Sequence, residues 1–254
     1  MKPGVFLLLF LPSLCFSQRN FPHLQAHAHN DYEHEHPLTD ALKAGFNSVE
    51  ADVHLYNNQL LAGHDSVTAA SPSLEALYLA PLDSILKANK GQVYAGHRGP
   101  FYLMIDVKTE AESSYQAIRA LLKKYPALLC GVASCPVKIF LSGNRPILTI
   151  VNEGYNGAAL DGRPGDVGKG FSSDLMPVIS DNYKNWSQWN GLAAPGKDDL
   201  LKIRKLAQSV HAEGKKLRLW AIPDNAIAWK ALMDAGVDLI NSDRLGELHE
   251  FLSK

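Results

Sequence analysis

The sequence contains little cysteine and no excess of charge of either sign. Three of the 254 residues are cysteines, and 25 basic residues stand against 26 acidic ones, for a formal net charge of −1. A chain so close to neutral lacks the basic surface with which proteins bind nucleic acid or an anionic membrane. We therefore expect no nucleic-acid partner.

The cysteines give little support for a metal cluster or a catalytic thiol. Cys130 and Cys135 form a C-x4-C pair without a second pair, which is poor support for zinc. No histidine-rich strand end accompanies them, as a cysteine nucleophile would require. In an oxidising compartment the two residues would close a small disulfide loop. The alternative is two free, partly buried thiols.

Long apolar runs are also missing. A bilayer-spanning helix needs about 20 apolar residues, and the run at residues 5–16 is too short. This run follows Met1 and Lys2. A basic start, an apolar middle and small residues near the exit are typical of a secretory signal peptide, which is removed from the mature protein.

The end of this run contains a candidate cleavage site. Cys15 and Ser17 occupy positions −3 and −1 of a cut after Ser17. We therefore expect residues 1–17 to be a signal peptide and residues 18–254 to form an exported, soluble monomer without a transmembrane segment. The alternative is a lipoprotein anchored through Cys15, but the residue before that cysteine is bulkier than the usual pattern.

The rest of the chain alternates between strand and helix patterns. Dense or alternating apolar stretches predict eight strands, at residues 23–29, 48–55 (with a turn into 59–62), 101–107, 137–141, 158–160, 177–180, 217–222 and 237–241. Amphipathic stretches with start and stop signals predict helices at residues 37–45, 73–88, 113–129, 198–214, 226–236 and 245–252. Residues 146–151 are compatible with a strand or a short helix.

This order predicts an α/β fold of the TIM (β/α)8 barrel type. Parallel strands need right-handed crossovers of about this length, and eight such units make one barrel. A doubly wound open sheet is the alternative. The chain has no composition break, repeat or low-complexity tract, so we expect a single domain.

Polar residues gather where the predicted strands end, which is where TIM barrels place their active sites. They are His29 and Asn30 after the first strand, Glu50 and Asp52 on the second, His64 in the following turn, Asp106 and Lys108 on the third, and Trp220 on the seventh. Residues two apart on a strand point to the same side. These side chains are therefore expected to meet at the barrel mouth.

Three converging carboxylates, on Glu50, Asp52 and Asp106, would repel one another unless a cation lay between them. Ligands that are all oxygen favour magnesium or calcium over zinc. A metal beside Lys108 suits a phosphate group, whose charge both would share. Two histidines beside such a site can serve as general base and general acid. The sequence predicts one divalent cation, Mg²⁺ or Ca²⁺.

This ordered set resembles that of the superfamily of PI-phospholipase C-like and glycerophosphodiester phosphodiesterases. The similar stretches are residues 30–45, residues 48–53 with the Gly63-His64-Asp65 turn, residues 105–108 in the D-x-K form of the sphingomyelinase D branch, and residues 219–222 and 236–243 on the last two strands. The resemblance implies a metal-dependent phosphoric diester hydrolase acting on a glycerophosphodiester or a phospholipid head group.

The resemblance also implies roles for individual residues. It makes His29 and His64 the acid/base pair, Glu50, Asp52 and Asp106 the metal ligands, Lys108 a phosphate contact and Trp220 part of the pocket wall. The implied mechanism is attack on phosphorus by a neighbouring substrate hydroxyl, which gives a cyclic phosphate that water can open.

One departure from the family pattern concerns Asn30. Glycerophosphodiesterases usually carry His-Arg-Gly at the first position, and this chain has His29-Asn30-Asp31. That is closer to the His-Asn of eukaryotic phosphoinositide phospholipases, where the Asn helps to bind calcium. Asn30 is therefore a candidate fourth ligand, and the substrate within the superfamily stays open.

Two other interpretations compete with this one. His27-Ala28-His29 is an H-x-H pattern, found in zinc-dependent amidohydrolase-type barrels, but the strand ends expected to supply further histidines have none. The other is a non-catalytic barrel that binds sugar or lipid head groups, with Tyr183, Trp186 and Trp189 of one loop stacking on the ligand. A binding protein would not need two histidines at the site.

Overall fold

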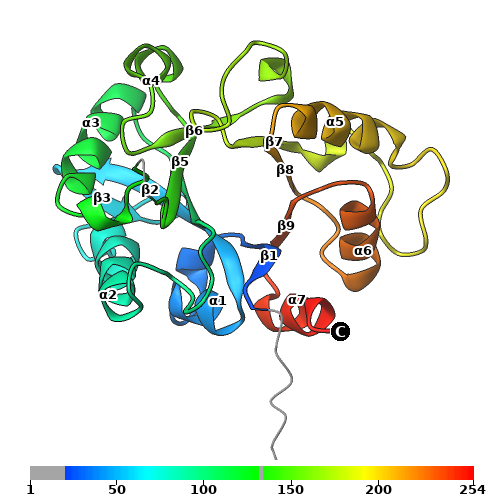
Figure 1. Ribbon diagram of the computed structural model, residues 1–254, viewed down its shortest axis with the longest axis horizontal. Helices are drawn as coiled ribbons and strands as arrows, with labels where there is room; N and C mark the ends of the chain where they lie inside the picture. The colour runs from blue at the N-terminus through cyan, green and yellow to red at the C-terminus, as the bar shows by residue number, and fades with distance from the viewer. Residues whose placement is uncertain (1–20, 132–133) are drawn as a thin grey trace, which may run out of the picture.

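A computed structural model describes residues 21–131 and 134–254. The predicted signal peptide, with Cys15, lies outside the described residues. Figure 1 shows the strands in the centre with the helices arranged around them, and β1 beside β9, where the chain closes on itself. Within residues 21–131 and 134–254, no helix has both the length and the apolar character needed to cross a membrane.

The predicted barrel is confirmed. Its eight parallel strands are β1 (His23–Ala28), β2 (Phe46–Tyr56), β4 (Phe101–Val107), β5 (Val137–Gly143), β6 (Ala159–Gly162), β7 (Val178–Asn182), β8 (Lys216–Trp220) and β9 (Leu239–Ser242). They follow one another around the sheet, and pairing of β1 with both β2 and β9 closes it. The short β3 (Gln59–Ala62) forms an antiparallel hairpin with β2.

The turn of that hairpin follows from its two asparagines. Asn57 and Asn58 have φ angles of 46° and 60°. This left-handed region is open to asparagine more readily than to most residues, and two such residues in a row make the type of tight turn that matches strand twist. The hairpin returns the chain to the barrel mouth just before His64.

Most connections between strands contain a helix. The helices are α1 (Thr39–Lys43), α2 (Ala80–Ala88), α3 (Ala111–Leu122), α4 (Ile147–Glu153), α5 (Leu201–Ala212), α6 (Ala226–Asp234) and α7 (Leu245–Leu252). The ambiguous residues 146–151 therefore belong to a helix. A π-helical segment, Glu75–Leu79, leads into α2, and β6 connects to β7 through a loop with a 3-10 turn at Pro164–Asp166.

Two predicted helices were too long. The helix expected at residues 113–129 ends at Leu122, and a separate 3-10 turn occupies Pro126–Leu128. Proline has no N–H for the helical ladder and clashes with the preceding turn, so it cannot continue the helix. The helix expected from residue 198 begins at Leu201, because the Asp199 carboxylate accepts the N–H of Gly196 in a turn.

The barrel interior has its own small core, separate from the large core between strands and helices. Five buried side chains form it, which we call the apolar floor: Met104, Phe140, Ala159, Val178 and Leu239. The residues on either side of a floor residue, such as Leu103 and Ile105 beside Met104, belong to the large core between strands and helices, which we call the outer core. This alternation is the period-2 pattern of a strand that is covered on both faces.

Candidate active site

A polar layer lies directly above the apolar floor. Two positions beyond each floor residue, on the same face of the same strand, comes a polar residue: Asp106, Ser142, Asp161, Ser180 and Asn241. Each of these five strands therefore changes from apolar to polar within two residues. The floor closes the barrel from below, and the polar layer opens toward the carboxyl ends of the strands.

A cavity of about 280 Å³ occupies this end of the barrel. It is lined by all eight residues predicted from the sequence, His29, Asn30, Glu50, Asp52, His64, Asp106, Lys108 and Trp220, together with Ser142, Gly143, Arg163 and Arg218. The structure thus brings the whole predicted set to one place, although Trp220 follows Lys108 by more than a hundred positions in the chain.

Glu50, Asp52 and Asp106 converge as a carboxylate cluster. Each offers an oxygen, and these oxygens all lie within 4.8 Å of one another. β2 and β4 pair in parallel with Asp52 opposite Asp106, which fixes the two side chains at the same level. Lys108 Nζ lies 2.9 Å from Asp52 Oδ2 and 3.5 Å from Asp106 Oδ1.

This cluster has features that suit a hard cation. Asp52 Oδ1 is buried and accepts no hydrogen bond from any described residue. Burial raises the pKa of Asp106 to about 6, and the neighbouring carboxylates add to the increase. Asn30 lines the same cavity and has a neutral amide oxygen to offer. Oxygen ligands of this kind, with little room, are those of magnesium or calcium.

A carboxylate anchors each of the two predicted histidines. His29 Nδ1 lies 2.8 Å from Asp243 Oδ1, and His64 Nδ1 lies 2.8 Å from Asp52 Oδ2. Burial lowers the pKa of His29, but the hydrogen bond and charge of Asp243 outweigh it, so the pKa is raised. With Nδ1 engaged, Nε2 of each ring is the nitrogen left for proton transfer.

Tyr32 belongs to the site although sequence reasoning gave it no role. Its hydroxyl donates to Asp52 Oδ2 over 2.8 Å and lies 3.3 Å from His64 Nδ1. Asp52 Oδ2 thus contacts a phenol, an imidazole and an ammonium group, while its other oxygen stays unpartnered. The only clue in the sequence was the position of Tyr32, three residues after His29.

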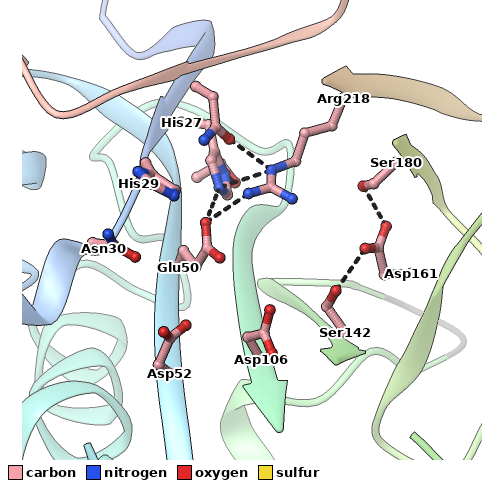
Figure 2. A network of polar contacts seen from close by, with 12 residues as sticks. His27, His29, Asn30, Glu50, Asp52, Asp106, Ser142, Asp161, Ser180 and Arg218 are labelled. Carbon is pink, nitrogen blue, oxygen red and sulfur yellow. Dashed lines mark hydrogen bonds and ion pairs between the residues drawn. The ribbon is translucent and has the colours of Figure 1, made fainter. Parts of the chain in front are cut away.

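Arg218 on β8 was also missed. Its Nη2 donates to Glu50 Oε2 over 2.6 Å, and its Nε donates to Asn241 Oδ1 over 2.7 Å (Figure 2). Burial favours the neutral form of Glu50, but the Arg218 charge and the hydrogen bond of His27 outweigh it and lower the pKa to about 2. An arginine between two leucines, two residues before Trp220, was the available signal.

His27 is part of this network and does not fit the role of a zinc ligand. Its Nδ1 lies 2.6 Å from Ser48 Oγ, and its Nε2 lies 3.3 Å from Glu50 Oε2 and 3.2 Å from Arg218 Nε. Burial and the Arg218 charge lower the pKa of His27 to about 4, so the ring is neutral at pH 7. Both ring nitrogens have protein partners, and a guanidinium occupies the place that a metal would need.

A second buried network forms the opposite wall. Asp161 accepts hydrogen bonds from Ser142 over 2.8 Å and from Ser180 over 2.5 Å (Figure 2). Arg163 Nη1 lies 2.8 Å from Asp161 Oδ2, and its guanidinium lies over the Trp220 ring, 5.3 Å from the centroid. Arg163 lines the cavity and had no predicted role.

The aromatic loop proposed as a stacking platform is packed instead. Tyr183 is buried, and Trp186 Nε1 donates to Asp181 over 2.8 Å. Trp186 and Trp189 pack against the outer core. Trp186 and Trp189 stay partly exposed, but none of the three aromatic residues lines the cavity at the barrel mouth.

Away from the site, Cys130 and Cys135 form a disulfide. This is the first of the two alternatives left open by the sequence. Neither cysteine lines the cavity.

The chain is similar to fungal proteins along most of its length. It is 29% identical over 259 residues to the altered inheritance of mitochondria protein 6 homolog of Arthroderma benhamiae, covering 87% of this chain and 81% of the relative. It is also 29% identical to altered inheritance of mitochondria protein 6 of Eremothecium gossypii, covering 89% of this chain and 69% of that relative.

A solved structure supports the fold. The glycerophosphodiester phosphodiesterase from Agrobacterium tumefaciens superposes with a TM-score of 0.51, covering 91% of this chain and 99% of that structure at 12% sequence identity. A family model described as the AIM6-like phosphodiesterase domain matches residues 16–153, which is more than half of the chain and reaches from before β1 to the end of α4. The chain therefore belongs to the AIM6-like phosphodiesterase domain family.

Proposed function

We propose that this protein is a metal-dependent phosphoric diester hydrolase that cleaves a glycerophosphodiester or a phospholipid head group. One observation carries the proposal: two carboxylate-anchored histidines, a carboxylate cluster and a lysine line the same cavity. The family model and the structural neighbour, both phosphodiesterases by description, support this class of chemistry.

The residues present fit a divalent cation. Glu50, Asp52 and Asp106 would hold it, with Asn30 as a fourth ligand, and the unpartnered oxygen of Asp52 is accounted for in this way. When bound, Mg²⁺ or Ca²⁺ would draw charge from the phosphoryl oxygens and favour attack on phosphorus. Because ligands must be deprotonated, binding of the cation should weaken as the pH falls below about 6, the pKa of Asp106.

The side chains of the cavity supply the proton transfers. One of His29 and His64 takes the proton of the attacking hydroxyl through Nε2, and the other donates a proton to the leaving oxygen. If the attacking hydroxyl belongs to the substrate, the P–O bond to the leaving group breaks as a cyclic phosphate forms. Lys108, held beside Asp52, contributes positive charge to the phosphoryl group.

The test is a panel of phosphodiesters assayed with and without added Mg²⁺ or Ca²⁺. Replacement of His29 or His64 by Ala should lower kcat by about 10²- to 10⁴-fold, the usual contribution of a general acid or base. His36→Ala is a matched control, because His36 is exposed and does not line the cavity. Wild-type activity in either active-site variant would refute the acid/base assignment.

We also propose that the protein is exported through the signal in residues 1–17 and acts as a monomer. The composition of that segment supports the first point. Cell fractionation of the native chain, and light scattering of the purified protein, test the two statements separately. Neither outcome bears on the chemistry of the cavity.

A further inference from the structure

We infer that Arg218 binds a phosphoryl oxygen of the substrate while it holds Glu50 in place. The inference deepens the proposed function and rests on it. Arg218 projects from β8 into the barrel and is only 2% exposed, and it lines the cavity together with Trp220, two residues further along the same strand. Its remaining exposed surface therefore faces the space that a ligand would fill.

The hydrogen bonds of the guanidinium group leave one end unused. Nη2 donates to Glu50, and Nε donates to His27 (Figure 2) and to Asn241, while Nη1 makes no hydrogen bond to any residue in the described part of the chain. A guanidinium has five N–H donors in a fixed planar fork. The three bonds made by Nε and Nη2 lock its orientation, and the free edge can receive an anionic oxygen without a loss of side-chain entropy.

The charges of the surrounding side chains favour an anion at this free edge. The three carboxylates of the cluster carry −3, and Lys108 and Arg218 carry +2, so these five side chains sum to −1. Binding of one divalent cation would change the sum to +1. A phosphodiester, with a single negative charge, then enters a site of opposite sign, which strengthens its binding in a buried setting.

The two cations hold different ends of the cluster. Lys108 contacts Asp52 and Asp106, whereas Arg218 contacts Glu50. A phosphoryl group above the cluster would thus meet a positive side chain on each side. Arginine is better suited than lysine to such a place, because its fork matches the oxygens of phosphate and it stays charged when buried.

The alternative is a purely structural role, in which Arg218 only neutralises Glu50. Both roles predict weaker metal binding when Arg218 is replaced, because Glu50 loses its partner. They differ in what happens to an anion once the metal is saturating. Loss of the Arg218 charge weakens phosphate binding in either role, whereas only a direct contact from Nη1 lowers the phosphate affinity of a variant that keeps the charge, Arg218→Lys.

The experiment measures binding of Mg²⁺, and then of inorganic phosphate at saturating Mg²⁺, by titration calorimetry. The full chain is compared with Arg218→Met and Arg218→Lys. We expect Arg218→Met to weaken phosphate binding by about 10- to 100-fold, the factor expected for one hydrogen bond to a charged group. Arg218→Lys should recover part of this loss, since it keeps the charge but not the fork.

Arg204→Met is the matched control, because Arg204 lies on the surface of α5 and donates to the backbone oxygen of Asp234. Its phosphate affinity should equal that of the wild type. Unchanged phosphate affinity in Arg218→Met would overturn the inference. Full affinity in Arg218→Lys would overturn the direct contact from Nη1. If Arg218→Met fails to fold, Arg218→Lys decides on its own.

The proposed function can fail separately. If the wild type turns over no phosphodiester in the panel, but its phosphate binding depends on Arg218, the anion site stands and the hydrolase assignment falls. If the wild type is an active phosphodiesterase, but neither KM nor phosphate affinity changes in the Arg218 variants, the hydrolase assignment stands and the role of Arg218 falls.

Discussion

The two halves of the barrel mouth carry side chains of opposite character. The half built on β1, β2 and β4, which we call the acidic half, presents the carboxylate cluster and both histidines. The half built on β6 and β8, the basic half, presents Arg163 and Arg218 around Trp220. Cleavage of a phosphodiester needs both proton transfer and neutralisation of the charge on the phosphoryl oxygens. The acidic half offers groups for the first need, and the basic half offers groups for the second.

The halves also differ in how their charges are held. In the acidic half, Asp52 has a buried oxygen without a partner, and burial raises the pKa of Asp106. In the basic half, Asp161 is fully buried but accepts from two serines and Arg163. Unsatisfied polar groups in a native protein call for an explanation such as an ion or a catalytic role. The acidic half thus has features that suit a ligand, whereas in the basic half the buried Asp161 holds Arg163 in place.

The largest effect is expected in the acidic half. Asp52→Asn keeps the shape of the side chain but removes the charge that contacts His64 and Lys108 and that would hold the proposed cation. We expect kcat to fall by about 10³-fold or more, because the acid/base pair and the metal site are damaged together. Thermal unfolding should show that the barrel persists, and Asp52→Ala should lose at least as much activity.

Chelation examines the same half without a mutation. Removal of divalent cations should abolish phosphodiesterase activity, and readdition of Mg²⁺ or Ca²⁺ should restore it. Activity that persists in excess chelator would contradict a metal in the acidic half. It would leave the acid/base assignment to be judged by the histidine variants alone.

A smaller effect is expected from Arg163→Met in the basic half. Loss of this residue leaves Asp161 buried without its charged partner, so we expect a destabilisation of about 2–3 kcal/mol, less than the 3–5 kcal/mol of a fully buried pair because Arg163 is 31% exposed. We expect KM to rise by about tenfold, as for one hydrogen bond to a charged group. Denaturant unfolding and steady-state kinetics measure the two effects.

A double variant separates these two effects. Arg163→Met with Asp161→Asn removes both charges, so it should recover stability but keep the raised KM. If KM recovers as well, the basic half does not contact the substrate through Arg163. The comparison between the halves would then rest on Arg218.

The smallest effect is expected from Asp243→Asn, which alters only the setting of His29. The hydrogen bond and charge of Asp243 raise the pKa of His29, so their loss should lower it. The limb of the pH profile of kcat/KM that reports His29 should therefore move to lower pH, whether the ring acts as acid or as base. The rate at the optimum should fall by less than about tenfold, because the charge is lost but the amide oxygen can still accept the Nδ1 hydrogen of His29.

An NMR titration of the His29 ring measures the same pKa directly. A profile and a titration that both stay in place would show that Asp243 does not control His29. His64, anchored by Asp52 rather than Asp243, serves as the internal reference in the same spectra.

The acidic half could be predicted from the sequence because its residues lie close together in the chain and follow the period of a strand. Glu50 and Asp52 alternate with Val49 and Ala51, so both the strand and its polar face can be read locally. The barrel followed in the same way from the alternation of strand and helix patterns. Helix ends were less accurate, since proline and aspartate turns shortened them.

Trp220 of the basic half was predicted, but the two arginines beside it were not, because their roles depend on side chains brought together by the fold. Arg218 is one of two charged residues in a short strand, and its partner Glu50 lies 168 positions earlier. Arg163 similarly looks like an ordinary residue of a strand-end turn until Asp161 and Trp220 are seen beside it. Local periodicity contains no information on such pairs.

Because alternate residues of a strand face opposite sides, the change from the apolar floor to the polar layer makes the active site depend on which positions of each strand face inward. On β4, Met104 and Asp106 point inward, while Leu103 and Ile105 belong to the outer core. Deleting one residue early in β4 would therefore exchange the two faces, bringing an apolar side chain into the cavity and turning the aspartate toward the helices. Insertions and deletions of odd length within these strands should abolish function, whereas the loops at the opposite end of the barrel, which contribute no residue to the cavity, can vary in length without disturbing the site.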